Sequence, residues 1–320
     1  MIKGKRIYVV IPAYNEEKNI LKVLETLPSF VDMAVVVDDC SKDTTVKLAE
    51  QFKEKRTGVR CQLIIHARNR GVGATIVSGY RRAREEKADV CAVMAGDGQM
   101  DPKELELIVM PVVDNQAEYV KGNRLIHANV WQIMPKYRFL GNSFLSLLTK
   151  IASGYWKMAD SQTGYTAISL SILEKLRLGS LYARYGFPND ILVKLNIVYG
   201  RVHEVPIKPI YDGQRSNIHL TKVIPTMSWL LLKGFLWRMK TKYMIRDFHP
   251  LVFFYFFGLT FFILGILFGI YLLIYRISAG PVSATSALFS ALFVISGLQS
   301  LFFGMWFDME DNKELFSKDV

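Results

Sequence analysis

A strand, a polar loop and the start of a helix follow one another in Val90-Cys91-Ala92-Val93-Met94-Ala95-Gly96-Asp97-Gly98-Gln99-Met100-Asp101-Pro102. The first five residues are apolar and predict a buried strand. Asp101 and Pro102 suit the N-cap and N1 positions of the helix that follows. Asp97 and Gln99 lie between the two elements, where an open α/β sheet binds its ligands.

The same alternation of short apolar runs and helical patterns precedes this stretch. We expect strands at residues 7–11, 34–37 and 63–65, and helices at residues 16–27, 44–52 and 73–87. Near-continuous apolar strands between helices are typical of a parallel sheet covered on both faces. The sequence therefore predicts an α/β domain in which Asp38-Asp39 and Asp97 meet at the carboxyl edge of the sheet. Beyond residue 125 we expect helices at 131–151 and 188–199, a strand at 165–169 and an extended segment at 202–210.

The composition indicates a mixed soluble and membrane protein. Of 320 residues, 51% are apolar and 22% are charged, and the mean hydropathy is +0.18. Forty Lys and Arg against twenty-nine Asp and Glu give a net charge of +11, which favours an anionic partner such as a membrane surface, nucleic acid or a phosphorylated substrate. The apolar and aromatic content excludes disorder. Three separated cysteines exclude a disulfide scaffold and a paired-cysteine zinc site, so we expect reduced packing residues.

Two uncharged runs, residues 251–275 and 282–307, exceed the length of about 20 residues that crosses a bilayer. A pair of buried core helices is the alternative. The link 276–281 is short, so we expect a hairpin with both flanks on one side of the membrane. Basic residues precede the first run, whereas the tip carries only Arg276, and the positive-inside rule then places the large domain and both termini in the cytoplasm. The N-terminal apolar run 7–11 is too short for a signal peptide.

Residues 220–248 combine Trp and Leu with many bases, which predicts amphipathic helices in the headgroup layer. An ordinary helix on the domain surface is the alternative. The predicted organisation is a catalytic domain at 1–219, interfacial helices at 220–248, the two spans within 249–307 and a cytoplasmic tail at 308–320.

Acidic and amide side chains at the strand ends suggest a divalent cation. The sequence lacks a glycine-rich phosphate loop, and its five histidines show no ligand spacing. Magnesium binds through one or two carboxylates plus substrate phosphates, so Asp97 with Gln99 would suffice in a chain this basic. The alternative for Asp97 is a carboxylate that only caps a turn and the following helix.

Several motifs in register resemble glycosyltransferase family 2. They are Pro12-Ala13-Tyr14-Asn15-Glu16, Val37-Asp38-Asp39-Cys40-Ser41, Asn69-Arg70-Gly71 and Gly96-Asp97-Gly98-Gln99-Met100-Asp101-Pro102. Later ones are similar to the dolichyl-phosphate mannose synthase branch, which comprises polyprenyl-phosphate glycosyltransferases: Gly122-Asn123-Arg124, Asp160-Ser161-Gln162-Thr163-Gly164-Tyr165, Val205-Pro206-Ile207 and Gln214-Arg215-Ser216. The resemblance covers residues 5–220. It implies a GT-A fold, Rossmann-like with a mostly parallel sheet, followed by amphipathic helices and a two-helix transmembrane hairpin.

The resemblance also implies roles for individual positions. The nucleotide sugar would be held by Pro12, Ala13, Tyr14, Glu16, Asp39, Asn69, Gly71, Asp97 and Arg215, with Asp39 at the base or ribose. Asp97 and Gln99 would bind Mg²⁺ or Mn²⁺, although Ala95 replaces the first acid of the family's Asp-x-Asp motif. The acceptor phosphate would be met by Arg124, Arg138 and Asn142, with Asp160 and Asp190 as the acids near it.

For several of these residues a structural role is the alternative. Arg138 would then only contact headgroups, Arg124 would form a structural bridge, and Asp190 would cap the helix that begins near Pro188. We choose Asp97, Asp160, Asp190 and Arg124 as the catalytic candidates.

The sequence thus predicts a membrane-bound inverting transferase that moves a sugar from a nucleotide diphosphate sugar to a polyprenyl phosphate. A first alternative transfers the sugar to a hydroxyl of a glycolipid or polysaccharide, with Asp190 as the base. A second is an inactive sugar-nucleotide-binding scaffold, which Ala95 favours. We expect no nucleic-acid partner, and association of the membrane helices would allow a homo-oligomer.

Overall fold

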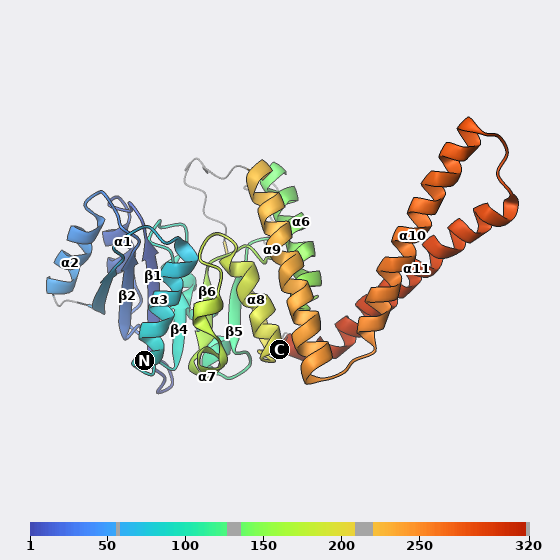
Figure 1. Cartoon of the computed structure of the whole chain (residues 1–320). Helices are drawn as coiled ribbons and strands as arrows, with labels where there is room; N and C mark the ends of the chain where they lie inside the picture. Colours follow the sequence, from blue (N-terminus) through green and yellow to red (C-terminus); the bar gives the residue numbers. More distant parts are fainter. Residues whose placement is uncertain (56–57, 127–135, 209–219, 318–320) are drawn as a thin grey trace. The chain divides into compact units, whose positions relative to one another are not determined.

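The computed structural model describes residues 1–55, 58–126, 136–208 and 220–317 (Figure 1). It forms two compact units. The first comprises Met1–Phe235 together with the C-terminal segment Glu314–Val320, and the second comprises Leu236–Lys313. Each unit is described by itself below.

The first unit is built on one sheet whose order is β3-β2-β1-β4-β6-β5-β7. The strands are β1 (Ile7–Ala13), β2 (Met33–Asp38), β3 (Arg60–Ile65), β4 (Val90–Val93), β5 (Tyr119–Asn123), β6 (Thr166–Ser169) and β7 (Val202–Pro206). β1 to β4 pair in parallel, as predicted, and β5 pairs in parallel with β7. β6 runs antiparallel to both β4 and β5, so the sheet is mostly but not entirely parallel.

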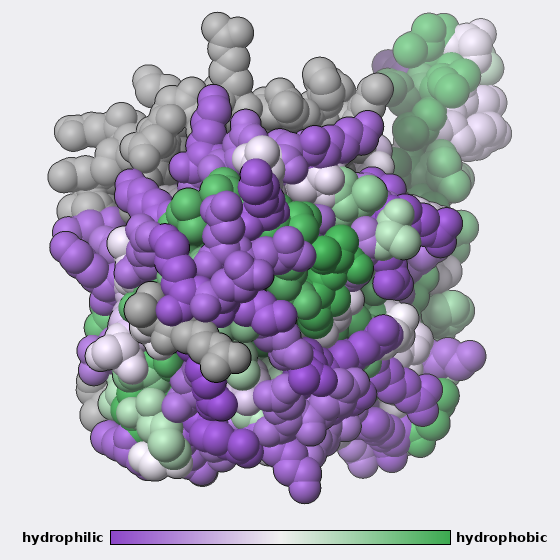
Figure 2. All heavy atoms as spheres, turned by 90° about the vertical axis from the view of Figure 1, so that its left-hand side faces the viewer, coloured by the Kyte–Doolittle hydropathy of each residue, from purple (hydrophilic) through white to green (hydrophobic). Residues whose placement is uncertain are grey.

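Helices cover both faces of this sheet, and two apolar clusters form between them and the strands. The helices are α1 (Ile20–Glu25), α2 (Thr45–Lys55), α3 (Val72–Glu85), η1 (Pro102–Glu104), α4 (Leu105–Val113), α6 (Lys136–Ser153), α7 (Leu170–Lys175), η2 (Leu178–Ser180) and α8 (Phe187–Ile197). Alternate residues of β1 enter opposite clusters: Ile7 and Val9 pack with α1, α2 and α4, whereas Tyr8 and Val10 pack with α3, α7 and α8. Because helices cover both faces of the sheet, residues on both sides of β1, β2 and β4 are buried, and these strands are therefore continuous apolar runs in the sequence. Figure 2 shows the end of the sheet with α2 and β3, where mainly hydrophilic residues cover the surface.

The first predicted helix is shorter than expected, because residues 14–19 form a loop before α1. Asn15, just before the predicted helix, has a positive φ of 57°, and residues 17–19 form a turn rather than helix. Side chains of the segment after β2 take the backbone N–H groups of this loop: Asn15 N donates to Ser41 Oγ at 2.9 Å and Glu16 N to Thr45 Oγ1 at 2.8 Å. The two segments are therefore tied together beyond the carboxyl ends of β1 and β2.

The C-terminal tail returns to the first unit. Leu315, at the end of the short helix η4 (Lys313–Leu315), is buried in the cluster beneath α8, and Phe316 forms a parallel bridge with Val202. Ser317 N donates to Val202 O at 2.9 Å. The tail thus adds to the outer edge of β7, and both chain segments that flank the apolar helices lead into the same unit.

The second unit contains two long apolar helices, α10 (Leu251–Ser278) and α11 (Ala284–Asp311). Their most apolar windows have mean hydropathies of 2.5 and 1.8, and only 17% of each window is buried. A core helix of a soluble domain would be buried on most sides, so these helices fit the predicted transmembrane hairpin. Glycines let the two backbones approach closely: a Cβ at Gly297 would lie 2.5 Å from Phe262 N, and one at Gly265 would lie 2.7 Å from Val294 N.

Before the hairpin come α9 (Leu220–Lys240) and a π-helical segment, Thr241–Arg246. The first part of α9 belongs to the first unit, where Leu231 packs with Ala152 of α6 and Val193 of α8. Trp229 and Leu232 are exposed beside them. This part of the predicted interfacial segment therefore buries one side against the domain and leaves an apolar side uncovered.

Candidate active site

Asp39, at the end of β2, holds the loop that leads into α3. Its Oδ1 lies 2.8 Å from His66 Nδ1 and accepts from Arg70 N at 2.9 Å, while its Oδ2 accepts from Gly71 N at 2.7 Å. Asp39 is only 3% exposed. The contact of Asp39 with a base or ribose stays a prediction. In the structure, the hydrogen bonds of Asp39 fix the conformation of the loop before α3.

Gly71 and Asn69 lie on the same loop. Gly71 has a φ of 93°, and a Cβ there would lie 2.6 Å from the carbonyl oxygen of Ala183. A larger residue would therefore both strain the backbone and displace the segment before α8. Asn69 is exposed on this loop.

The loop after β1 carries the other residues predicted to hold the nucleoside. Pro12 and Ala13 end β1, and their carbonyls accept from Gly96 N and Asp39 N at 3.1 and 2.9 Å. Tyr14 is 44% exposed at this edge. Burial raises the pKa of Glu16, and the carboxylates of Asp97 and Asp43 add to the rise. The carboxylates of Glu16 and Asp97 therefore lie near enough to interact electrostatically. This places the loop after β1 close to the predicted metal site.

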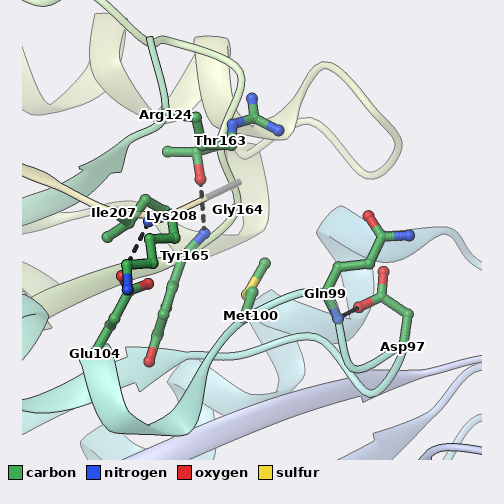
Figure 3. A pocket seen from close by; sticks show the side chains of 10 residues that line it. All are labelled: Asp97, Gln99, Met100, Glu104, Arg124, Thr163, Gly164, Tyr165, Ile207 and Lys208. Atoms are coloured by element: carbon green, nitrogen blue, oxygen red, sulfur yellow. Dashed lines mark hydrogen bonds between the residues drawn. The ribbon is translucent and has the colours of Figure 1, made fainter. Parts of the chain in front are cut away.

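Asp97 lies in the loop between β4 and η1. Its Oδ1 accepts from Gln99 N at 3.0 Å, and burial raises the pKa of this carboxyl. Asp97 and Gln99 line a small pocket of ≈ 70 Å³ (Figure 3). Its other lining residues lie before or within η1, after β5, before β6 and after β7: Met100, Glu104, Arg124, Thr163, Gly164, Tyr165, Ile207 and Lys208. The pocket thus brings together the predicted metal ligands and the predicted phosphate-binding arginine.

Arg124 and Asp160 form a tight ion pair at this pocket. Asp160 Oδ2 accepts from Arg124 Nε at 2.8 Å, and its Oδ1 accepts from a terminal guanidinium nitrogen at 3.1 Å. Asp160 is fully buried, yet its pKa is lowered, because the raising effect of burial is outweighed by the charge and hydrogen bonds of Arg124 and by Lys121. Asp160 is therefore an ionised acceptor that fixes the guanidinium, and its role as an acid near the acceptor stays a prediction.

Asp190 makes different contacts. Its Oδ2 accepts from Tyr182 N at 2.7 Å and forms an ion pair with Lys194 one turn along α8. Its neighbour Asn189 is fully buried and accepts from Gln162 Nε2 at 2.9 Å. Asn189 is therefore the residue that contacts the loop of Asp160, through its side-chain amide. The carboxylate of Asp190 instead binds the segment that precedes α8.

Three further predicted residues are only partly placed. Arg138 lies in the first turn of α6, but its side chain is outside the described residues, and Arg215 lies outside them altogether. Asn142 is half-buried on the next turn of α6. Among the described residues, no cluster of three or more His, Cys, Asp or Glu could hold a metal ion.

Sequence reasoning missed two buried ionic residues beside the ion pair. Lys121 of β5 is fully buried and donates to Thr163 O at 2.7 Å; burial lowers its pKa to about 8, against the opposing charges of Asp160 and Glu204. Glu204 of β7 is the residue opposite Lys121 in the sheet. A lysine and a glutamate within apolar strands are the signal that could have identified them.

Known proteins share part of this sequence and its fold. The family model "Glycosyl transferase family 2" matches residues 8–177. The UDP-N-acetylglucosamine–dolichyl-phosphate N-acetylglucosaminyltransferase of Methanococcus voltae is 34% identical over 223 residues, covering 65% of this chain and 86% of that protein. The undecaprenyl-phosphate mannosyltransferase of Micrococcus luteus is 28% identical over 206 residues, covering 63% and 82%.

Among solved structures, glucosyl-3-phosphoglycerate synthase of Mycobacterium tuberculosis, in complex with Mn²⁺, UDP and its product, superposes with a TM-score of 0.55. It is 18% identical and covers 73% of this chain and 80% of its own. At this identity the likeness concerns the fold.

Proposed function

Because the chain belongs to glycosyltransferase family 2, we propose that it is a membrane-bound inverting enzyme that transfers a sugar from a nucleotide diphosphate sugar to a polyprenyl phosphate. The similar proteins of Methanococcus voltae and Micrococcus luteus carry dolichyl-phosphate and undecaprenyl-phosphate in their names. Their sugars differ, and the sugar that this chain transfers is left open by the proposal.

One observation carries the proposal: the guanidinium of Arg124 is fixed by buried Asp160 beside a pocket that Asp97 and Gln99 also line. A guanidinium suits phosphate oxygens because it offers parallel N–H donors. An acceptor phosphate at Arg124 would therefore face a donor diphosphate held near Asp97. Arg138 and Asn142, on consecutive turns of α6, are proposed to extend this acceptor site.

The contacts of Asp190 favour a phosphate acceptor over a hydroxyl. A hydroxyl needs a base to take its proton, whereas a phosphate oxygen is already ionised at neutral pH. Asp190 was the predicted base for the hydroxyl alternative, but its carboxylate is engaged by Lys194 and by Tyr182 N. We therefore assign Asp190 a supporting role and Asp160 the orientation of Arg124.

The residues present fit a divalent cation bound mainly through substrate. Asp97 supplies one carboxylate and Gln99 one amide oxygen, and Glu16 adds negative charge nearby. This is compatible with Mg²⁺ or Mn²⁺, which would neutralise the leaving diphosphate when bound. Arg215 is proposed to close over the same diphosphate.

The step follows from these placements. A phosphate oxygen of the acceptor attacks the anomeric carbon, the bond from that carbon to the diphosphate breaks, and the nucleoside diphosphate leaves with the electron pair. Attack from the opposite side inverts the anomeric configuration. The residues of the chain contribute position and charge stabilisation, since the nucleophile needs no activation.

Exposed apolar side chains support a lipid acceptor. On α6 they are Leu140, Phe144 and Leu147, with exposures of 66%, 47% and 51%, and they recur at helical spacing on one face. Trp229 and Leu232 are exposed on the adjoining α9. We propose that these faces meet the membrane, with the catalytic unit and both termini on the cytoplasmic side.

A donor panel tests the function. Purified full-length protein is given GDP-mannose, UDP-glucose or UDP-N-acetylglucosamine with a polyprenyl phosphate and Mg²⁺, and the lipid products are analysed. We expect one donor to yield a polyprenyl phosphate sugar of inverted configuration. Turnover only with a glycolipid hydroxyl would favour the first alternative, and nucleotide binding without turnover would favour the inactive scaffold.

A further inference from the structure

Glu204 is a buried acid of the first unit that the proposed chemistry does not use, and its carboxylate accepts three hydrogen bonds. Its Oε2 accepts from Ala159 N at 2.8 Å and from Asn123 Nδ2 at 2.9 Å, and its Oε1 accepts from Asp160 N at 2.9 Å. Glu204 is 9% exposed. All of these bonds are accepted by the carboxylate, so the ionised form matches its surroundings.

These bonds reach both halves of the Arg124–Asp160 ion pair. On one side Glu204 binds the backbone of Asp160 and of the preceding residue. On the other it binds Asn123, whose Oδ1 accepts from Leu125 N at 2.9 Å and so orders the backbone that follows Arg124. One carboxylate on β7 therefore fixes the loop of the acid and, through Asn123, the loop of the arginine.

The charges around this carboxylate balance. Glu204 and Asp160 supply two negative charges, and Lys121 and Arg124 two positive ones. Burial raises the pKa of Glu204, the two backbone bonds lower it, and the charge of Asp160 raises it again. Retaining a second carboxylate beside buried Asp160 is unfavourable unless it does something that an apolar residue cannot do, and here it satisfies three donors from two loops.

We propose that Glu204 is a positioning residue for transfer: it sets where the Arg124 guanidinium meets the acceptor phosphate. The proposal rests on the proposed function, in which Arg124 binds that phosphate. Displacing a binding group by about 1 Å can cost about a hundredfold in rate, so the loss of a support beneath Arg124 should be visible in kinetics.

The test is Glu204→Gln in the full-length enzyme, assayed with varied polyprenyl phosphate and, separately, by calorimetric binding of the nucleotide. The amide replaces one oxygen with an NH₂ group that faces N–H donors, so either the bond from Asp160 N or the bonds from Ala159 N and Asn123 Nδ2 are lost. We expect the apparent KM for polyprenyl phosphate to rise by about tenfold or more. Nucleotide affinity should stay near that of the wild type, because the loops after β1 and β2 do not contact Glu204.

The chain offers a matched control in Glu118. Glu118, just before β5, also connects the two strands, because it binds Arg201, just before β7. Arg201 N donates to Glu118 Oε2 at 2.6 Å, and the guanidinium of Arg201 donates to Glu118 Oε1 at 2.7 Å. This contact lies at the opposite ends of the two strands. Glu118→Gln should lower the melting temperature but leave acceptor KM unchanged. An equal rise of KM in both variants would show general loosening of the sheet and overturn the proposal.

A second variant keeps the test decisive if Glu204→Gln does not fold. Asn123→Ala leaves Glu204 bonded to the Asp160 loop but removes both the bond to Glu204 and the acceptor of Leu125 N, which is the whole link to the Arg124 loop, so acceptor KM should again rise selectively. Unchanged acceptor kinetics in a folded Glu204→Gln or Asn123→Ala enzyme would refute the role of Glu204 while leaving the proposed function intact. Absence of transfer by the wild-type enzyme with every donor would instead refute the proposed function itself.

Discussion

Replacement of Arg124 by alanine tests the centre of the proposed site and should have two separable effects. The first is on stability, because Asp160 is fully buried and loses its bidentate partner. Removing one partner of a buried ion pair costs about 3–5 kcal/mol. Asp160 keeps the bond from Gln162 N at 3.1 Å and the nearby charge of Lys121, so we expect the lower end, about 3 kcal/mol.

In a unit of this size a loss of about 3 kcal/mol corresponds to a fall of about 6–12 °C in melting temperature. The second effect is on catalysis. Loss of a guanidinium that stabilises the attacking acceptor phosphate should reduce turnover by about a hundredfold to a thousandfold. Arg124→Lys should recover only part of the activity, since the charge returns without the fork.

The double variant Arg124→Ala/Asp160→Asn separates the two effects. The neutral amide removes the unpaired buried charge, so at least half of the lost stability should return. Transfer should remain as low as in Arg124→Ala, because no group replaces the guanidinium. Melting is followed by circular dichroism in detergent, and transfer by lipid product analysis. If the double variant regains both stability and transfer, Arg124 acts only as a structural bridge and our assignment of the acceptor site is wrong.

Asp97→Ala should lower turnover by at least about a hundredfold, while Gln99→Ala should be milder and partly restored by more Mg²⁺; full wild-type activity in excess chelator would contradict a metal role. Asp190→Asn should mainly lower the melting temperature and have a smaller effect on kcat for transfer, because the contacts of Asp190 are Lys194 and Tyr182 N. A stable but inactive variant would instead favour the hydroxyl acceptor. Burial raises the pKa of Cys61 to about 11, so only about one thiol in a thousand is ionised at pH 8, and its alkylation should speed up about tenfold per pH unit. A cysteine at Ser278 should be labelled by an impermeant reagent from outside the cell, and labelling only from the cytoplasmic side would reverse the proposed topology.

The parallel half of the sheet could be predicted because its strands carry a strong local signal. β1, β2 and β4 are buried on both faces, and their uninterrupted apolar runs show it. β6 is short and half of its residues carry hydroxyl groups, and four such residues do not indicate whether the strand pairs in parallel. Its antiparallel direction follows from the path of the chain between β5 and β6, which includes α6 and is not encoded in the strand itself.

The candidate site was predictable in its residue types and less so in its contacts. Asp97, Arg124 and Asp160 were chosen from motifs, and the structure brings Arg124 together with each of the others. Asp190 was chosen as a carboxylate near the acceptor, but its partner Lys194 lies one helical turn away and neutralises it. Glu204 escaped notice because its bonds join segments 44 and 81 positions away in the sequence, which only the fold brings together.

The predicted orientation of the hairpin depends on the excess of Lys and Arg before the first span over those at its tip. The structure buries some of these bases, and the excess keeps its sign. Arg238 and Lys242 were counted among the bases before the first span, yet in the second unit both are buried, Arg238 against Asp308 at 2.7 Å and Lys242 against Asp311 at 2.8 Å. The positive-inside rule still counts these bases, because it depends on Lys and Arg and acids contribute little to it. Lys233, Lys240 and Arg246 remain exposed in the same stretch, whereas the tip of the hairpin carries Arg276, in the last turn of α10, as its one base. Buried and exposed bases together therefore concentrate positive charge before the first span, and the predicted orientation rests on this excess over the single base at the tip.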